Sequence, residues 1–490
     1  MRRSGILLHI TSLPGPGGIG TLGPEAYKFA DFLKEAGMRL WQVLPCGPTG
    51  YGESPYQSSS VFAGNPLMIS AEKLAADGLL TLKPEDLADD GDPERVDFER
   101  VRARSTAMLR RAYRENGERL KDEVAAFAQE NEWLPDFALF TALKERYGGL
   151  QWTKWPDEAL RMRRKTALAK AREELAEEIA FHSFVQYLFY RQWREFKRYC
   201  NGLGIDLFGD MPIYVAEDSA DTWTHPEVFQ LDKNRVPKRV AGVPPDYFSA
   251  DGQLWGNPLY RWIYLRNRDY DWWVDRMRGM TRMYDLVRVD HFIGFANYWS
   301  VPYGAPNART GKWIVGPGKE LFDTLNRELP GLNIVAEDLG VVSERVKKLI
   351  AYVGYPGMRT LCFAFDGSAD NIHHPNNLQK NLVYYTGTHD NDTIRSFIRQ
   401  MDENSLANAK KTLHFETLDE GVKAFVKGCL DSVCDTAVVP MQDVLGLDNE
   451  ARMNLPGTIG GNWVWRMLPG AADQKTAAWL RKLNKESKRL

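Results

Sequence analysis

Short apolar runs alternate along the chain with longer stretches of mixed apolar and polar residues. Eight of the runs have the length and the content of Val, Ile, Leu and aromatic residues that buried strands show. They are 5–13, 40–45, 205–215, 286–292, 333–340, 359–365, 382–388 and 436–445. Helical patterns lie between most of them, for example at 24–38 and at 343–353, where Ser343 is a plausible N-cap.

Alternating strands and helices predict a parallel sheet, and eight such strands predict an α/β fold closed into a (β/α)8 TIM barrel. An open, doubly wound sheet is the alternative. A barrel of this kind needs about 250 residues, so a chain of 490 residues carries large insertions in one catalytic domain spanning 1–490.

The longest insertion, approximately 66–203, separates the second and third strands and has a charged, helical pattern. An apolar stripe from Leu175 to Phe196 predicts a helix that packs on the barrel, with His182 as a buried core residue. A further insertion, approximately 216–285, carries a loop at 242–258 that is rich in aromatic and polar residues.

Three of the predicted strands end on an acidic residue. Asp290, Glu337 and Asp390 follow the fourth, fifth and seventh runs. A single carboxylate after a strand is more often a helix cap or a turn residue. Three of them at the carboxyl ends of parallel strands would meet at the face where barrel active sites lie. The pattern therefore predicts one acidic site.

The residues before each carboxylate indicate different roles. Strand alternation places Arg288 and Asp290 on one face, so the cation should keep Asp290 charged, which suits a nucleophile. Only apolar residues precede Glu337, and desolvation there would raise its pKa, as a proton donor requires. Asp390 follows His389 in a sharp polar turn and can complement positive charge on a substrate. These roles are typical of retaining glycosyl transfer.

Composition excludes several other classes of protein. The net charge of −2, from 63 basic and 65 acidic residues, provides no patch for nucleic acid or an anionic membrane. No apolar run is long enough to span a bilayer, and Ile6 to Ile10 is too short for a signal peptide. Five cysteines without metal-ligand spacing predict reduced thiols and a cytoplasmic protein.

A metal-dependent hydrolase is the main alternative to glycosyl transfer, because His291, His389 and the nearby acidic residues could all bind a metal ion. Barrel hydrolases of that class usually end their first strand on two histidines one residue apart, whereas His9 here is followed by Ile10 and Thr11. We therefore expect neither a metal nor a cofactor.

Longer motifs, distributed almost from end to end, carry a resemblance to a known family. The chain resembles the 4-α-glucanotransferases of the amylomaltase or disproportionating-enzyme type, glycoside hydrolase family 77 of the α-amylase superfamily. The matching segments are GPTGYGESPYQ (47–57), FAGNP (62–66), GDMPIYVAEDSADTW (209–223), GVPPDYFSADGQLWGNPLY (242–260), RVDHF (288–292), VAEDLG (335–340), YPGMR (355–359), GTHDNDT (387–393), ARMNLPGT (451–458) and GNWVWR (461–466).

The resemblance implies a barrel with helical insertions and no C-terminal β-domain, in which Asp290 is the nucleophile, Glu337 the general acid/base and Asp390 the transition-state stabiliser. The carboxyl groups of Asp290 and Glu337 would then lie about 5–5.5 Å apart. The residues implied to bind the sugar at the reacting subsite, or to line its pocket, are Arg288, His291, His389, Asp210 and Tyr56.

The loop at 242–258 bears on whether water or a second sugar accepts the transferred unit. Phe248 and Trp255 offer flat apolar faces to sugar rings, and Asp246 and Gln253 can bind hydroxyls; Tyr51, in a Gly-rich loop, would also stack on sugar. The resemblance implies transfer between α-1,4-glucans, either maltodextrin or starch-type. An α-1,4-glucan hydrolase and a non-catalytic maltodextrin-binding protein are the alternatives. The oligomeric state is not predicted.

Overall fold

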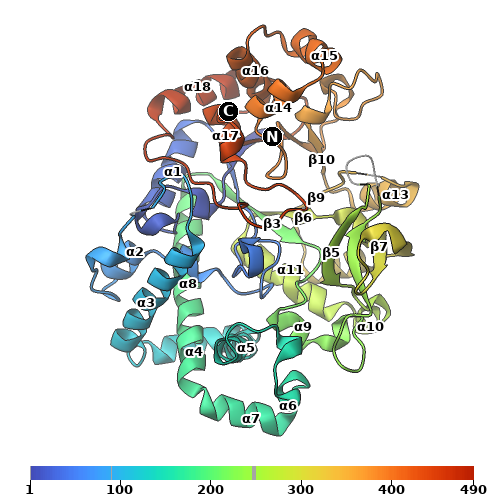
Figure 1. Ribbon diagram of the computed structural model, residues 1–490. Coiled ribbons are helices and arrows are strands. Elements are labelled where there is room, and N and C mark those ends of the chain that lie inside the picture. Colours follow the sequence, from blue (N-terminus) through green and yellow to red (C-terminus); the bar gives the residue numbers. More distant parts are fainter. Residues whose placement is uncertain (1, 90, 246–249, 341) are drawn as a thin grey trace.

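The fold is built around a parallel sheet of eight strands. The computed structural model describes residues 2–89, 91–245, 250–340 and 342–490 (Figure 1). The strands are β1 (Arg3–Leu7), β2 (Leu40–Gln42), β3 (Asp206–Pro212), β6 (Leu286–Asp290), β9 (Ile334–Ala336), β10 (Gly357–Thr360), β11 (Leu382–Tyr385) and β12 (Thr436–Pro440). Their order is β10-β11-β12-β1-β2-β3-β6-β9, with every pair parallel. The barrel of eight parallel strands is confirmed. The sixth predicted strand, 359–365, overlaps β10 only at Arg359 and Thr360, because Leu361–Phe363 forms a 3-10 helix.

The two end strands of this sheet, β9 and β10, are joined mainly by hydrogen bonds to the side chain of Asp338. One backbone bond joins them, from Ala336 N to Pro356 O at 2.9 Å. The carboxylate of Asp338 then accepts hydrogen bonds from Met358 N, at 2.7 Å, and from the guanidinium of Arg359, at 2.9 Å. A Cβ atom on Gly357 would lie 2.7 Å from this carboxylate, so glycine provides the necessary space. Asp338 thus completes the barrel next to Glu337.

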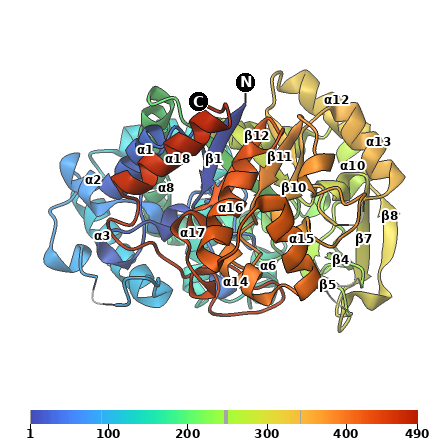
Figure 2. The ribbon, with the colours of Figure 1, turned by 90° about the horizontal axis from the view of Figure 1, so that it is seen from above.

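Helices surround the barrel and cover its outer face (Figure 2). The predicted helix at 343–353 is confirmed: Ser343 caps it by accepting a hydrogen bond from Val346 N, and Gly354 ends it with a φ of 69°. Outside the insertion between β2 and β3, the helices are α1 (Pro24–Glu35), α9 (Ala220–Thr224), α10 (Trp262–Arg266), α11 (Asp271–Met283), α12 (Lys319–Glu328), α13 (Glu344–Val353), α14 (Ile394–Gln400), α15 (Glu403–Leu413), α16 (Leu418–Asp431), α17 (Met441–Leu445) and α18 (Gln474–Glu486).

Between β2 and β3 the chain forms a group of helices that lies below the barrel in the view of Figure 1. They are α2 (Ala71–Ala76), α3 (Phe98–Asn116), α4 (Lys121–Glu130), α5 (Leu134–Arg146), α6 (Glu158–Arg161), α7 (Lys165–Glu174) and α8 (Ala176–Gly202). Several have their own buried cluster, which includes Phe140, Trp155 and Trp223. The long α8 reaches the barrel, where Trp193 donates to Met283 O at 3.0 Å.

A second sheet of four antiparallel strands was not predicted. Its order is β5-β4-β7-β8, from β4 (Arg239–Val243), β5 (Gln253–Pro258), β7 (Asn297–Pro302) and β8 (Lys312–Val315). The segment 242–258 is therefore not a loop throughout. The β5 sequence QLWGNP contains Gly, Asn and Pro, which are typical of turns, but it pairs with β4, where Gly242 lies opposite Leu254. Long-range pairing overrides the local preference.

The described residues contain no helix that is long and apolar enough to cross a membrane.

Replacing Asp338 with Ala should destabilise the barrel at the junction of β9 and β10. The substitution leaves the Arg359 guanidinium and the Met358 N–H without their acceptor, and losing one partner of a buried ion pair costs about 3–5 kcal/mol. Urea unfolding measures the change in free energy. Asp206→Ala is the control, because its 3.4 Å pair with Arg3 is partly exposed and should contribute less than about 1 kcal/mol. Equal losses in both variants would contradict this role for Asp338.

Candidate active site

Arg288 links two carboxylates at the carboxyl end of the barrel. It lies opposite Asp210 in the pairing of β3 with β6. Its Nη1 donates to both oxygens of Asp210, at 2.7 and 2.6 Å, and its Nη2 donates to Asp290 Oδ1 at 2.7 Å. Burial opposes the charge of Arg288, but Asp210 and Asp290 outweigh it and hold the pKa of the guanidinium well above its ordinary value. The predicted ion pair between Arg288 and Asp290 is present.

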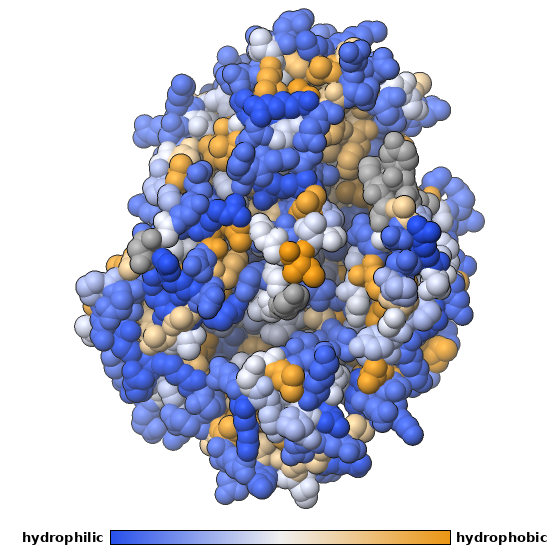
Figure 3. All heavy atoms as spheres, viewed as in Figure 1, coloured by the Kyte–Doolittle hydropathy of each residue, from blue (hydrophilic) through white to orange (hydrophobic). Residues whose placement is uncertain are grey.

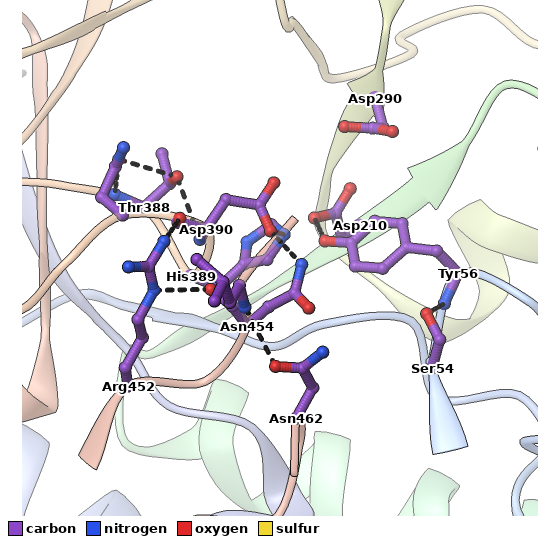
Figure 4. Close-up of polar contacts among 12 residues, drawn as sticks. Ser54, Tyr56, Asp210, Asp290, Thr388, His389, Asp390, Arg452, Asn454 and Asn462 are labelled. Carbon is purple, nitrogen blue, oxygen red and sulfur yellow. Dashed lines mark hydrogen bonds and ion pairs between the residues drawn. The ribbon is translucent and has the colours of Figure 1, made fainter. Parts of the chain in front are cut away.

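Tyr56 extends this network toward the end of β11. Its hydroxyl donates to Asp210 Oδ2 at 2.8 Å, and its ring stacks on His389 with centroids 5.1 Å apart and planes at 17° (Figure 4). Trp463 packs against both rings, at 5.8 and 5.9 Å. Trp463 is buried, as expected for a packing residue, but it supports the site. Through Arg288, Asp210 and Tyr56, the network therefore connects Asp290 to His389, which directly precedes Asp390.

Glu337 lies just after β9, and both of its carboxylate oxygens are held by backbone groups. Oε2 accepts from His291 N at 2.8 Å, and Oε1 accepts from Leu339 N at 2.7 Å. Burial, followed by the negative charge of Asp290, raises the pKa of Glu337 to about 8, against the opposing effects of Arg288 and the two N–H groups. The direction of this shift agrees with the expectation from the sequence, and it favours the protonated carboxyl near neutral pH.

His291 takes a backbone conformation that few histidines adopt, with a φ of 52°. This turn directs its N–H at Glu337 and its ring at Trp255, with centroids 4.8 Å apart and planes at 90°. Burial lowers the pKa of His291 to about 4, so the ring is neutral at pH 7. Within the described part of the chain, its buried Nε2 has no hydrogen-bond partner. This nitrogen can bind a ligand.

Asp390 is held by residues that the sequence motifs contained but to which we assigned no role. Asn454 Nδ2 donates to Asp390 Oδ1 at 2.7 Å, and Arg452 donates to the Asp390 backbone oxygen at 2.6 Å (Figure 4). Both belong to ARMNLPGT. The Asp390 side chain is 44% exposed and open to the cleft. The sequence signal that could have identified Arg452 and Asn454 is their position as polar residues in a segment that contains Gly and Pro.

Asp390, Arg452 and Asn454 border a cleft of about 2060 Å³, and the corresponding face in Figure 3 is hollowed, with a mostly hydrophilic rim. Its wall includes Asp390, Gln253 and Trp255, together with residues of α3, α5 and α8. The indole N–H of Trp255 donates to Gln253 Oε1 at 3.1 Å, so these two residues of β5, both predicted to bind sugar, contact each other. The cleft is long enough to extend from the barrel to the inserted helices.

The structure brings most of the predicted site residues together. The network and its immediate contacts contain Asp290, Glu337, Asp390, Arg288, Asp210, Tyr56, His291, His389, Trp255 and Gln253. Asp246 and Phe248 lie outside the described residues. Tyr51 begins the short helix Tyr51–Glu53, and the placement of its side chain is not described.

Among the described residues, one group of three possible metal ligands occurs: Glu145, Glu178 and His182, in the inserted helices. Arg110 forms ion pairs with both glutamates, and His182 Nε2 lies 3.3 Å from Glu145. The group is thus an ion-pair network that already contains a cation. His182 is buried on the predicted face of α8.

Replacing Glu337 with Gln should stabilise the fold by an amount that grows with pH. A carboxyl whose pKa is raised from about 4.3 in the unfolded chain to about 8 in the folded one loses stability as pH rises between these values. Gln does not ionise, so it avoids this loss. The difference in thermal midpoint between variant and wild type should increase from pH 4.5 to pH 8 and then level off. A difference independent of pH would contradict the raised pKa.

Comparison with known proteins places the whole chain in a family. The family model described as 4-alpha-glucanotransferase matches residues 8–471. The chain is 47% identical to the 4-alpha-glucanotransferase of Thermus thermophilus, over 100% of this chain and 99% of the relative. It is 44% identical to that of Streptococcus pneumoniae strain TIGR4, over 97% and 95%.

Solved structures agree with these relatives. Amylomaltase from Streptococcus agalactiae in complex with acarbose matches with a TM-score of 0.97 and 40% identity, over 100% of both chains. Amylomaltase from Corynebacterium glutamicum shares the fold at 19% identity, with a TM-score of 0.77 over 100% of this chain and 75% of its own. The chain described here belongs to the 4-alpha-glucanotransferase family, glycoside hydrolase family 77, and has 4-alpha-glucanotransferase activity.

Proposed function

We propose that this enzyme transfers segments of α-1,4-glucan between maltodextrins by a retaining double displacement at Asp290, Glu337 and Asp390. The observation that carries the proposal is the unequal environment of two neighbouring carboxyl groups. Asp290 contacts the guanidinium of Arg288, whereas burial and the charge of Asp290 raise the pKa of Glu337 to about 8. One group is suited to attack and the other to donate a proton.

In the first step, Asp290 attacks the anomeric carbon of the donor while Glu337 protonates the departing glycosidic oxygen. A β-linked glycosyl-enzyme forms. Positive charge develops at the anomeric carbon during this step, and Asp390, oriented by Asn454, stabilises it from the loop after β11. Asp210, Tyr56, His389 and the free Nε2 of His291 bind the hydroxyls of the reacting sugar.

In the second step, the now ionised Glu337 takes the proton from the 4-hydroxyl of an acceptor glucan, which attacks the intermediate with net retention. The acceptor is a maltodextrin or glucose. Trp255 and Gln253 lie on the cleft wall next to His291, and we assign them to the acceptor side, where they favour a sugar over water. We also assign the wall from α3, α5 and α8, within 66–203, to binding of the longer glucan.

Azide should rescue variants of Asp290 and Glu337 with opposite stereochemistry. With α-maltosyl fluoride as donor, Glu337→Ala still forms the glycosyl-enzyme, and azide attack on it gives an α-glycosyl azide. In Asp290→Ala, azide replaces the missing nucleophile and gives the β-anomer. Without azide, both variants should lose several orders of magnitude in transfer from maltotriose. NMR of the products assigns the anomers.

Asp86→Ala is the matched control for these two variants, because Asp86 is a buried, ion-paired carboxylate in the insertion. It should keep its transfer rate per folded molecule. Near-normal transfer in either Asp290→Ala or Glu337→Ala, or the same azide anomer from both, would contradict the assigned roles.

Replacing Trp255 with Ala should shift the enzyme from transfer toward hydrolysis. Losing the indole removes a sugar-binding face next to His291 and opens the site to water. With maltotriose as sole substrate, the wild type should produce glucose and a ladder of longer maltodextrins with few new reducing ends. The variant should release reducing ends at least about threefold faster relative to transfer.

Trp313→Ala is the control for this experiment. Trp313 lies on β8 in the same small sheet, is 43% exposed, and does not line the cleft. Its variant should keep the ratio of transfer to hydrolysis. An unchanged ratio in Trp255→Ala would exclude Trp255 from the selection of the acceptor.

A further inference from the structure

One buried carboxylate joins the two ends of the segment that carries His389 and Asp390. Asp443 lies on α17, just after β12, and is 3% exposed. Its Oδ2 accepts from the Thr386 hydroxyl at 2.6 Å, and its Oδ1 accepts from Ile394 N at 2.8 Å. Thr386 follows β11, and Ile394 begins α14. The segment 387–393 is thus anchored at both of its ends to one side chain.

The other contacts that support this segment act on residues from Asp390 to Thr393. Asn449 contacts Thr393 N and the carboxylate of Asp392, at 3.1 and 2.7 Å, and Arg452 and Asn454 contact Asp390. None of these contacts involves Thr386, the residue between β11 and the segment. Asp443 contacts both Thr386 and Ile394, so it links the end of the strand that precedes the segment to the start of the helix that follows it.

The surroundings of Asp443 make these two hydrogen bonds costly to lose. Thr386 and Ile394 are 0% exposed, so without the carboxylate their N–H and O–H groups have no access to water. A small cavity lies beside Asp443 under the segment and is bordered by His9, Gln442 and His389. Removing the Asp443 carboxylate enlarges this cavity beside the segment.

We propose that Asp443 is a positioning residue for Asp390: it touches no reacting atom, and it fixes the segment that presents the Asp390 carboxylate to the substrate. The proposal rests on the role assigned above to Asp390. Displacing a catalytic group by about 1 Å can reduce a rate by about 100-fold, so the effect should fall on kcat.

The first test compares Asp443→Ala with Asp443→Asn. The Ala variant should lose about 10- to 100-fold in kcat for transfer from maltotriose, with KM changed by less than about threefold. The Asn variant should keep kcat within about threefold of wild type, because its amide oxygen accepts from Ile394 N and its amide nitrogen donates to the Thr386 hydroxyl. Asp86→Ala controls for the loss of a buried carboxylate outside the barrel.

The second test asks whether Asp443 acts through Asp390. The donor is α-maltosyl fluoride, whose good leaving group keeps the rates of slow variants measurable. Asp443→Ala should reduce the rate strongly when it is introduced into the wild type, and only slightly when it is introduced into Asp390→Asn. In the Asp390→Asn background the further loss should be under about threefold, since there is no carboxylate left to position. Independent, multiplicative losses would overturn the proposal.

A purely structural role makes a different prediction. It would lower the thermal midpoint of Asp443→Ala and leave kcat per folded molecule unchanged, which would overturn the proposal. If Asp443→Ala does not fold, Thr386→Val removes one of the two bonds, and an unchanged kcat in that variant would overturn the proposal equally. Near-normal transfer in Asp390→Asn would instead disprove the proposed role of Asp390 itself, so the two failures are distinguishable.

Discussion

The buried guanidinium of Arg288 is the interaction on which the site depends. It lies between Asp210 and Asp290, and it makes charge-assisted hydrogen bonds to both. Without it, the buried carboxylate of Asp210 and the partly exposed carboxylate of Asp290 would both lose their cation. The pairing of β3 with β6 places Arg288 opposite Asp210, so the register of the barrel itself fixes this arrangement. Tyr56 carries the network onward to His389.

Glu337 shows how burial and charge divide the work of two similar side chains. Asp290 contacts Arg288 directly, and its negative charge adds to burial in raising the pKa of Glu337. The two N–H bonds to Glu337 hold its oxygens in place without overcoming this rise. In the double displacement that we propose, esterification of Asp290 removes that charge, so the Glu337 carboxyl ionises more readily in the second step. The same residue can then serve as acid in one step and base in the next.

Much of this could be predicted from the sequence, because the signals were local. Apolar runs marked the eight barrel strands, and strand alternation placed Arg288 and Asp290 on one face. The second sheet was missed because β5 has a turn-like composition and depends on distant partners. Asp338 and Asp443 were missed for a related reason: their hydrogen bonds join segments that are distant in sequence, which barrel closure brings together for Asp338 and the pairing of β11 with β12 for Asp443. The left-handed turn at His291 has no sequence signal, since histidine rarely adopts it.

Burial and the charge of Asp290 together keep a proton on Glu337 near neutral pH. Infrared difference spectroscopy of the protonated carboxyl band, assigned by its absence in Glu337→Gln, measures this directly across a pH titration. The wild type should titrate at a pKa of about 8, and Asp290→Asn should lower that value while leaving it above the ordinary glutamate range. Titration of Glu337 near pH 4.3 in the wild type, or a value unaffected by Asp290→Asn, would contradict the account.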